Sequence, residues 1–238
     1  MGKLLIKDKE VVVPGECLAQ GMDYLPGNGT YRDKEKIMAN RLGLVLIDGR
    51  AVKIIPLSGK YLPKRGDTII AEVTDILMSG WMINTNSAYH AMLSMKEATS
   101  EFIPKGADLT QYFTFGDYIL CKITNVTSQK LVDVTMKGPG LRKLRGGRII
   151  KVNTHKVPRV IGKKGSMVSM VKQATDCKII VGQNGLIWLQ GEDPKMELLA
   201  VETIKKIERE SHISGLTDNV KEYLEKATGK KLAVAAGE

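Results

Sequence analysis

The sequence predicts a multidomain chain that is mainly β in its N-terminal half and ends in an α+β domain. Short apolar segments bounded by Gly, Pro, Asn and Asp recur up to about residue 137, which is typical of β structure. Apolar residues at helical spacing then flank a Gly-Lys-Lys-Gly loop at 162–165. The 238 residues are enough for two or more domains, and we expect a small β module, a five-stranded barrel and an α+β domain.

Residues 1–60 are expected to form the small β module. A first strand is predicted at 11–16, where a Pro-Gly pair interrupts it. Segments 44–47 and 51–55 flank Asp48-Gly49, which is a strong signal for a β-hairpin. The module carries no constellation of catalytic side chains, so packing or docking is its expected role.

Residues 65–137 carry strand-like segments separated by turn residues, which predicts a small closed barrel. The five segments are 68–73, 80–84, 89–93, 115–123 and 130–135. The insertion at 94–114 has mixed character. Trp81 and Tyr89 are expected in the barrel core, whereas His90 is a candidate for surface contact with a ligand.

Residues 147–210 are predicted to form the α+β domain, with the element order β-α-α-β-β-α. Its three predicted strands are 148–152, 177–181 and 186–189. The last two strands are joined by Gly182-Gln183-Asn184-Gly185, and the final helix is capped by Asp193 with Pro194 at its first position. Beyond this domain, 211–238 holds one more amphipathic helix and a tail whose last residues are expected to be disordered.

The loop Gly162-Lys163-Lys164-Gly165 joins the first two helices of this domain. Pro158 is expected in the first turn of the helix before the loop, and Ser166 at the N-cap of the helix after it. Because glycine lacks a Cβ, another molecule can approach the backbone closely. The N-terminus of a helix favours an anion, and the two lysines add positive charge. The loop is therefore predicted to hold phosphate groups.

The net charge of +10 is concentrated in one part of the chain. Residues 134–175 contain no Asp or Glu, so every charged side chain in this stretch is positive. Such a stretch favours binding of a polyanion. Its cations are Lys137, Arg142, Lys143, Arg145, Arg148, Lys151, Lys156, Arg159, Lys163, Lys164 and Lys172. Gly-Pro-Gly at 138–140 and Gly146-Gly147 also fit an exposed interdomain linker, so the basic residues between them can serve as linker, as contact to nucleic acid, or as both.

Several function classes lack their sequence signals. The spacing of Cys17, Cys121 and Cys177 indicates neither a zinc site nor a disulfide framework. The sequence shows no carboxylate cluster for two metals, no phosphate-binding Gly-x-x-x-x-Gly-Lys-Ser/Thr loop and no His-Glu-x-x-His motif. We therefore expect no catalytic residues, no metal and no cofactor. Without a long apolar run or a signal peptide, the protein is expected to be cytoplasmic, with no membrane partner.

The β-α-α-β-β-α order, with Val160-Ile161 leading into the Gly-Lys-Lys-Gly loop, resembles a KH domain. In that family the Gly-x-x-Gly loop clamps the backbone of about four nucleotides beside an apolar groove. The resemblance implies phosphate contacts at Gly162–Gly165, with Ile161, Val168 and Ile179 as candidates for the groove wall.

The 65–137 barrel resembles the OB-fold of the ribosomal-protein S-one type, which binds RNA on the face of its second and third strands. Trp81, Tyr89 and His90 lie where the resemblance places this face. The usual pair of stacking phenylalanines is not evident, so phosphate contact is expected to dominate over base stacking.

The three-part order resembles the RNA-binding cap subunits of the archaeal exosome. The resemblance implies that residues 1–60 dock onto a hexameric ring of RNase PH-like subunits. It also implies a trimeric cap, which can be mixed with a second type of cap subunit. Such a cap is non-catalytic and recruits RNA, with a preference for poly(A), for 3′-to-5′ degradation by the ring.

The residues expected to contact RNA come from the loop, the basic stretch and the barrel. They are Gly162, Lys163, Lys164, Gly165, Ile161, Arg159, Lys151, Arg142, Lys143, Arg145, Arg148 and His90. A stand-alone RNA-binding protein acting in translation is the alternative. A nuclease fits worst, because the sequence motifs that would hold catalytic metals are missing.

Overall fold

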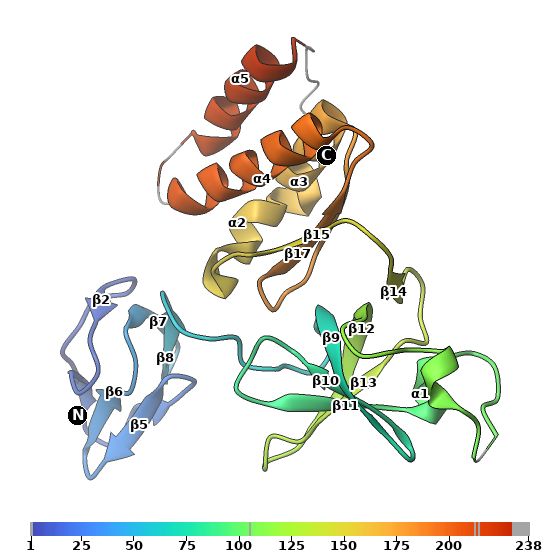
Figure 1. Ribbon diagram of the computed structural model, residues 1–238. Helices are drawn as coiled ribbons and strands as arrows, with labels where there is room; N and C mark the ends of the chain where they lie inside the picture. The colour runs from blue at the N-terminus through green and yellow to red at the C-terminus, as the bar shows by residue number, and fades with distance from the viewer. Residues whose placement is uncertain (1, 105, 212, 214, 230–238) are drawn as a thin grey trace. The chain divides into compact units, whose positions relative to one another are not determined.

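The computed structural model describes residues 2–104, 106–211, 213 and 215–229, and the tail expected to be disordered, 230–238, lies outside these residues. The chain divides into two compact units, Met1–Gly59 and Lys60–Glu238 (Figure 1). Among the described residues, no helix has both the length and the apolar character needed to cross a membrane.

The first unit packs two four-stranded sheets around one apolar core. In sheet order, the first contains β1 (Lys3–Leu4), β3 (Cys17–Gln20), β6 (Lys36–Ala39) and β5 (Thr30–Asp33). The second contains β2 (Val11–Val12), β7 (Gly43–Asp48), β8 (Ala51–Pro56) and β4 (Leu25–Pro26). The predicted hairpin is confirmed, since Asp48 pairs with Ala51 across the turn. The strand predicted at 11–16 is shorter, because Pro14 lacks an N–H and Gly15 has a φ of 87°.

The second unit begins with the predicted closed barrel, which is confirmed. Its strands are β9 (Thr68–Leu77), β10 (Gly80–Asn84), β11 (His90–Ser94), β12 (Tyr118–Val126) and β13 (Val132–Thr135). The order is β13-β11-β10-β9-β12, and pairing of β13 with β12 closes the barrel. In the insertion, α1 (Met95–Ala98) and η1 (Leu109–Gln111) each place a buried residue in the barrel core. Trp81 is fully buried there, as expected.

A sixth strand, β14 (Arg142–Leu144), joins the barrel sheet where the sequence suggests a linker. The first half of β12 pairs with β9 on one side, and only its second half pairs with β13. On its other edge, Tyr118–Leu120 pairs with β14. This pairing provides hydrogen-bond partners for backbone N–H and C=O groups of β12 that the barrel strands leave unpaired. Arg142 and Lys143 of the predicted basic stretch are thus held in a defined position on the barrel.

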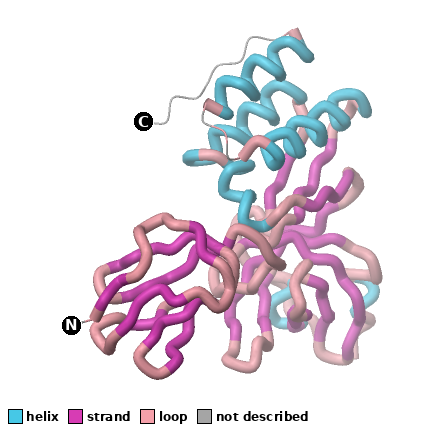
Figure 2. The backbone as a smooth tube through the Cα atoms, turned by 90° about the vertical axis from the view of Figure 1, so that its left-hand side faces the viewer, coloured by secondary structure: helices cyan, strands magenta, loops and turns pink. Residues whose placement is uncertain are grey.

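The α+β domain has the predicted order, with helices on one face of a three-stranded sheet (Figure 2). The sheet order is β15 (Arg148–Lys151), β17 (Leu186–Gln190) and β16 (Lys178–Val181). The helices are η2 (Thr154–Lys156), α2 (Val157–Ile161), η3 (Lys163–Gly165), α3 (Ser166–Thr175), α4 (Pro194–Arg209) and α5 (Leu216–Thr228). Leu216, Val220 and Leu224 of α5 join the core formed by the other helices and the sheet.

The barrel and the α+β domain meet at a seam, an apolar cluster that contains Ile70, Leu144 and Trp188. Buried Asn184 fixes the two domains to each other. Its amide nitrogen donates to the carbonyl oxygens of Ile70 at 2.7 Å and Thr85 at 2.8 Å. The sequence predicts only a turn at this position. Because these polar groups are buried and paired, they define a specific contact between the two domains.

Candidate nucleic-acid interface

The Gly-Lys-Lys-Gly loop has a backbone that requires its first glycine. Gly162 ends α2 with a φ of 76°, and its N–H donates to the carbonyl of Pro158 at 2.9 Å. A Cβ at Gly162 would lie 2.7 Å from the backbone nitrogen of Met167. Lys164 and Gly165 follow in left-handed conformations, with φ values of 51° and 83°. The chain therefore reverses within η3 and enters α3 directly.

The prediction that Ser166 caps α3 is wrong. Ser166 already has helical angles, φ −58° and ψ −41°, and Gly165 occupies the N-cap position without a side-chain hydrogen bond. The first turn of α3 therefore begins without a hydrogen bond from a capping side chain, and the Ser166 N–H donates to the carbonyl oxygen of Lys163. Lys163 and Lys164 are exposed directly before this turn. The arrangement brings positive side chains and the positive end of a helix dipole together.

The predicted contacts around the loop have mixed outcomes. Arg159 on α2 and Lys151 at the end of β15 are exposed. Ile161 and Val168 are half-buried and pack against the domain core, so part of each side chain reaches the surface. Ile179 is only 2% exposed and lies inside the core, so the expectation that it lines a groove is wrong. Alternation along β16 turns its side chain toward the helices, which a strand prediction without tertiary contacts does not reveal.

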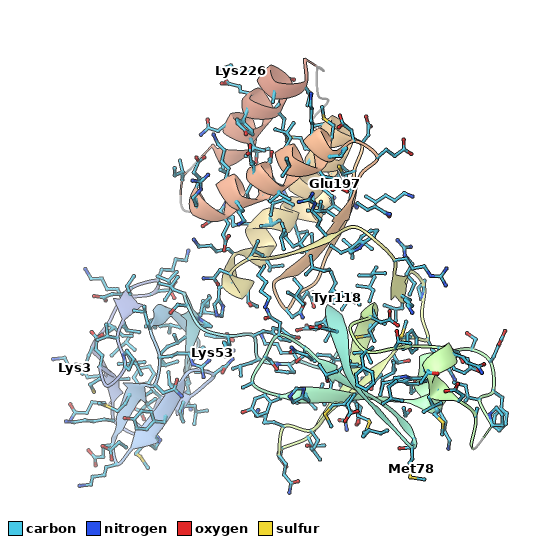
Figure 3. The ribbon with its side chains drawn as sticks, in the orientation of Figure 1. Lys3, Lys53, Met78, Tyr118, Glu197 and Lys226 are labelled. Atoms are coloured by element: carbon cyan, nitrogen blue, oxygen red, sulfur yellow. The ribbon has the colours of Figure 1, made fainter. Side chains whose placement is uncertain are left out.

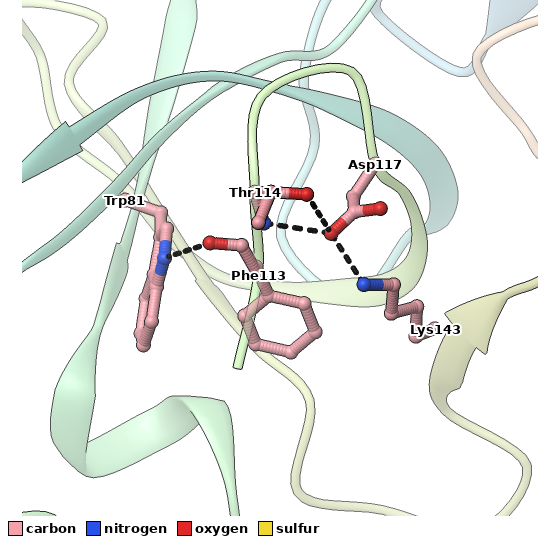
Figure 4. Close-up of polar contacts among 5 residues, drawn as sticks. All are labelled: Trp81, Phe113, Thr114, Asp117 and Lys143. Carbon is pink, nitrogen blue, oxygen red and sulfur yellow. Dashed lines mark hydrogen bonds and ion pairs between the residues drawn. The ribbon is translucent and has the colours of Figure 1, made fainter. Parts of the chain in front are cut away.

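The basic segment at 142–148 is partly neutralised. The Lys143 ammonium lies 2.5 Å from Asp117, whose Oδ2 also accepts from the N–H and hydroxyl of Thr114 (Figure 4). Burial opposes ionisation, but these hydrogen bonds hold the pKa of Asp117 below its usual range. Arg148 lies 3.2 Å from Glu197 of α4 (labelled in Figure 3). Arg142 and Arg145 are exposed. Of four predicted contacts, two are thus committed to carboxylates.

The outer face of the barrel strands β10 and β11 presents His90 opposite Asn84 and Met92 opposite Met82. His90 is exposed, as the surface prediction requires. On the neighbouring strand β9, Glu72 pairs with Asn84 and Asp75 pairs with Met82. Residues that pair directly across strands share a face, so two carboxylates border the predicted contact. This face is less suited to phosphate than the loop.

The first unit carries an exposed set of aliphatic side chains that is not among the residues predicted from the sequence. We call it the aliphatic patch, and it comprises Val11, Val13, Leu42, Leu44, Ile55 and Leu57. Five of these six side chains are 38–56% exposed, and Leu44 is half-buried. Pairing of Val11 with Leu44 and of Leu44 with Ile55 forms one row across β2, β7 and β8. The continuous apolar run at 44–47, which lacks the polar alternation of a solvated strand, is the signal that could have revealed it.

Comparison with known proteins shows the family of this chain. Residues 9–58 match the model of the N-terminal domain of the exosome RNA-binding protein RRP4, and residues 147–195 match a KH domain model. The exosome complex component Rrp4 of Methanothermus fervidus is 44% identical, with 93% of this chain and 97% of the relative covered. That of Methanothermobacter thermautotrophicus is 43% identical, with 95% and 71% covered. The chain belongs to the Rrp4 family of exosome complex components.

One solved structure agrees with this membership. A crystal structure of an exosome complex RNA-binding protein has 34% sequence identity and a TM-score of 0.64, and the match covers 71% of this chain and 97% of that one. The KH match of this Rrp4 family member contains the whole Gly-Lys-Lys-Gly loop, and the N-terminal match contains the aliphatic patch. The resemblance to exosome cap subunits predicted from the sequence is thereby confirmed.

Proposed function

We propose that this chain is a non-catalytic, RNA-binding cap subunit of an exosome. The observation that carries the proposal is the exposed Lys163-Lys164 pair at the N-terminus of α3, held by a glycine backbone that a Cβ would obstruct. Backbone amides and two lysines can hold successive phosphates without reading bases. Arg159 and Lys151 are also exposed and add positive charge to the KH domain. The loop is the primary site for the RNA backbone.

The first unit supplies the attachment to the degrading ring. The aliphatic patch is larger than scattered surface hydrophobes, and such patches mark protein–protein contact sites. We infer that it packs on a ring of RNase PH-like subunits, three caps to a ring. In this arrangement the ring performs the 3′-to-5′ degradation, and the cap raises the local concentration of RNA, including poly(A), near the ring.

The RNA-binding part of the proposal is tested with the full chain and a fluorescent single-stranded oligoadenylate. Lys163→Ala combined with Lys164→Ala should weaken binding about thirtyfold at low salt, because two phosphate contacts are lost. The matched control is Lys205→Ala combined with Lys226→Ala, which removes the same charge from exposed positions on α4 and α5. Equal losses in both variants would show that net charge, and not the loop, holds the RNA.

The docking part is tested by co-expression with RNase PH-like subunits and mass determination of the intact assembly. Val11→Lys combined with Ile55→Glu keeps the net charge and should abolish assembly while leaving RNA binding intact, since both side chains are exposed on the first unit. A wild-type chain that stays monomeric beside an intact ring would contradict the cap assignment and favour a stand-alone RNA-binding protein.

A further inference from the structure

A cleft of about 590 Å³ opens along the seam between the barrel and the KH domain. Its lining includes Tyr118 of β12, Lys143 of β14 and Arg145, together with Gly146 and Gly147 before β15, a glycine pair that we call the rim. Figure 3 shows Tyr118 on the side of the barrel that faces the KH domain. Pockets of this volume hold drug-sized ligands, a class that includes a nucleotide.

The rim of the cleft is fixed by a glycine pair and a tryptophan. Gly146 and Gly147 have φ values of 64° and 75°. A Cβ at Gly147 would lie 2.4 Å from the carbonyl oxygen of Leu189 and 2.9 Å from the indole nitrogen of Trp188. That indole nitrogen donates to the carbonyl of Gly146 at 2.8 Å. The backbone thus passes tightly over the indole, and the rim is preorganised.

The charges around the cleft favour an anion at one side only. Lys143 is balanced by Asp117, and Glu72 on β9 lies opposite Tyr118 on β12. Arg145 is exposed beside the cleft. An anionic group is therefore attracted at the Arg145 side, whereas the Tyr118 ring and the apolar side chain of Ile149 offer a surface for a flat, uncharged group.

We infer that the seam cleft holds one nucleotide of a bound RNA strand, with its phosphate at Arg145 and its base against Tyr118. One cation beside an aromatic ring is the arrangement by which proteins bind single-stranded nucleic acid with little sequence preference. The inference rests on the proposed function, because it takes RNA as the ligand of the Gly-Lys-Lys-Gly loop. In the chain, the cleft residues Arg145, Gly146 and Gly147 come before β15, and the loop follows β15 after η2 and α2.

The test follows the indole N–H signals of the ¹⁵N-labelled full chain. The chain has two tryptophans: Trp81 is fully buried in the barrel core, and Trp188 borders the cleft. Single-stranded oligoadenylate should shift the Trp188 signal, assigned with Trp188→Phe, and leave that of Trp81 in place. Adenosine monophosphate is titrated in parallel. If it shifts Trp188 at the same concentrations as the oligonucleotide, a free nucleotide and not a strand is the ligand, and the inference is overturned.

Affinity measurements add a second readout. Arg145→Glu should weaken oligoadenylate binding about tenfold, against little change for Lys205→Glu on α4. Tyr118→Leu should weaken it about fivefold, and Tyr118→Phe should restore the loss because the ring is kept. If RNA binds through the loop but neither Trp188 nor these variants respond, the cleft inference fails and the proposed function stands. If the wild-type chain binds no RNA, both fail.

Discussion

The Gly162–Gly165 loop and the 142–148 segment are both strongly basic, but they differ in how many of their cations pair with carboxylates. Lys163 and Lys164 are exposed at the start of α3. In the 142–148 segment, Lys143 is held by Asp117 and Arg148 by Glu197. A cation that is already hydrogen-bonded to a carboxylate has less electrostatic attraction left for phosphate. The number of basic residues in a stretch therefore overstates the charge that RNA can use.

The largest expected effect is on the salt dependence of RNA affinity, which should change more for variants of the loop than for variants of the 142–148 segment. Lys163→Glu combined with Lys164→Glu should weaken RNA binding about a hundredfold and reduce the slope of log K against log salt by about two. The measurement is a titration at several salt concentrations. Lys143→Glu combined with Arg148→Glu is the comparison, and a slope change as large as that of the loop variant would erase the proposed difference.

Removing the ion pair on the barrel should affect stability more than RNA binding. Lys143→Ala should lower the free energy of unfolding by about 1 kcal/mol, because the pair with Asp117 is partly buried. Arg142→Ala, at an exposed neighbouring position, should leave it almost unchanged. Urea unfolding of the three proteins measures this. An RNA affinity that falls more for Lys143→Ala than for Arg142→Ala, with equal stability, would assign Lys143 to RNA after all.

The same ion pair predicts a pH dependence. Burial raises the pKa of Asp117, but the hydrogen bonds from Lys143 and Thr114 together hold its folded-state pKa below its ordinary range, so the ionised carboxylate stabilises the fold at neutral pH. The stabilisation is lost as the pH falls through the lowered pKa. The stability difference between wild type and Asp117→Asn should therefore be constant near neutral pH and shrink below about pH 4. A difference that persists in strong acid would contradict an electrostatic origin.

The smallest effect is expected on the barrel face. His90→Ala should change RNA affinity by less than about twofold, since Glu72 and Asp75 on the adjacent strand oppose phosphate there. The measurement uses the same oligoadenylate, with Met92→Ala on the same face as the control. A fivefold loss confined to the His90 variant would show that this face takes part in binding.

The sequence predicted the local elements well because each carries its own signal. All five barrel strands were predicted, since alternation and turn residues mark each of them. The sequence does not predict β14, because this strand forms only by pairing with the first half of β12. That half of β12 has a free edge in the folded barrel, since β13 pairs only with the second half. At Asn184 the sequence indicates only a turn, because no neighbouring residue shows that its amide donates to the carbonyls of Ile70 and Thr85.

The sequence by itself determined the Gly-Lys-Lys-Gly loop, the order of the folding elements and the place of the excess charge, because these depend on neighbouring residues. The tertiary structure alone decided which cations remain available to bind phosphate and where the seam cleft forms. Asp117 lies 26 residues from Lys143, and Glu197 lies 49 residues from Arg148. Neutralisation acts over a few ångströms in space, whereas a sequence pattern reports only separation along the chain.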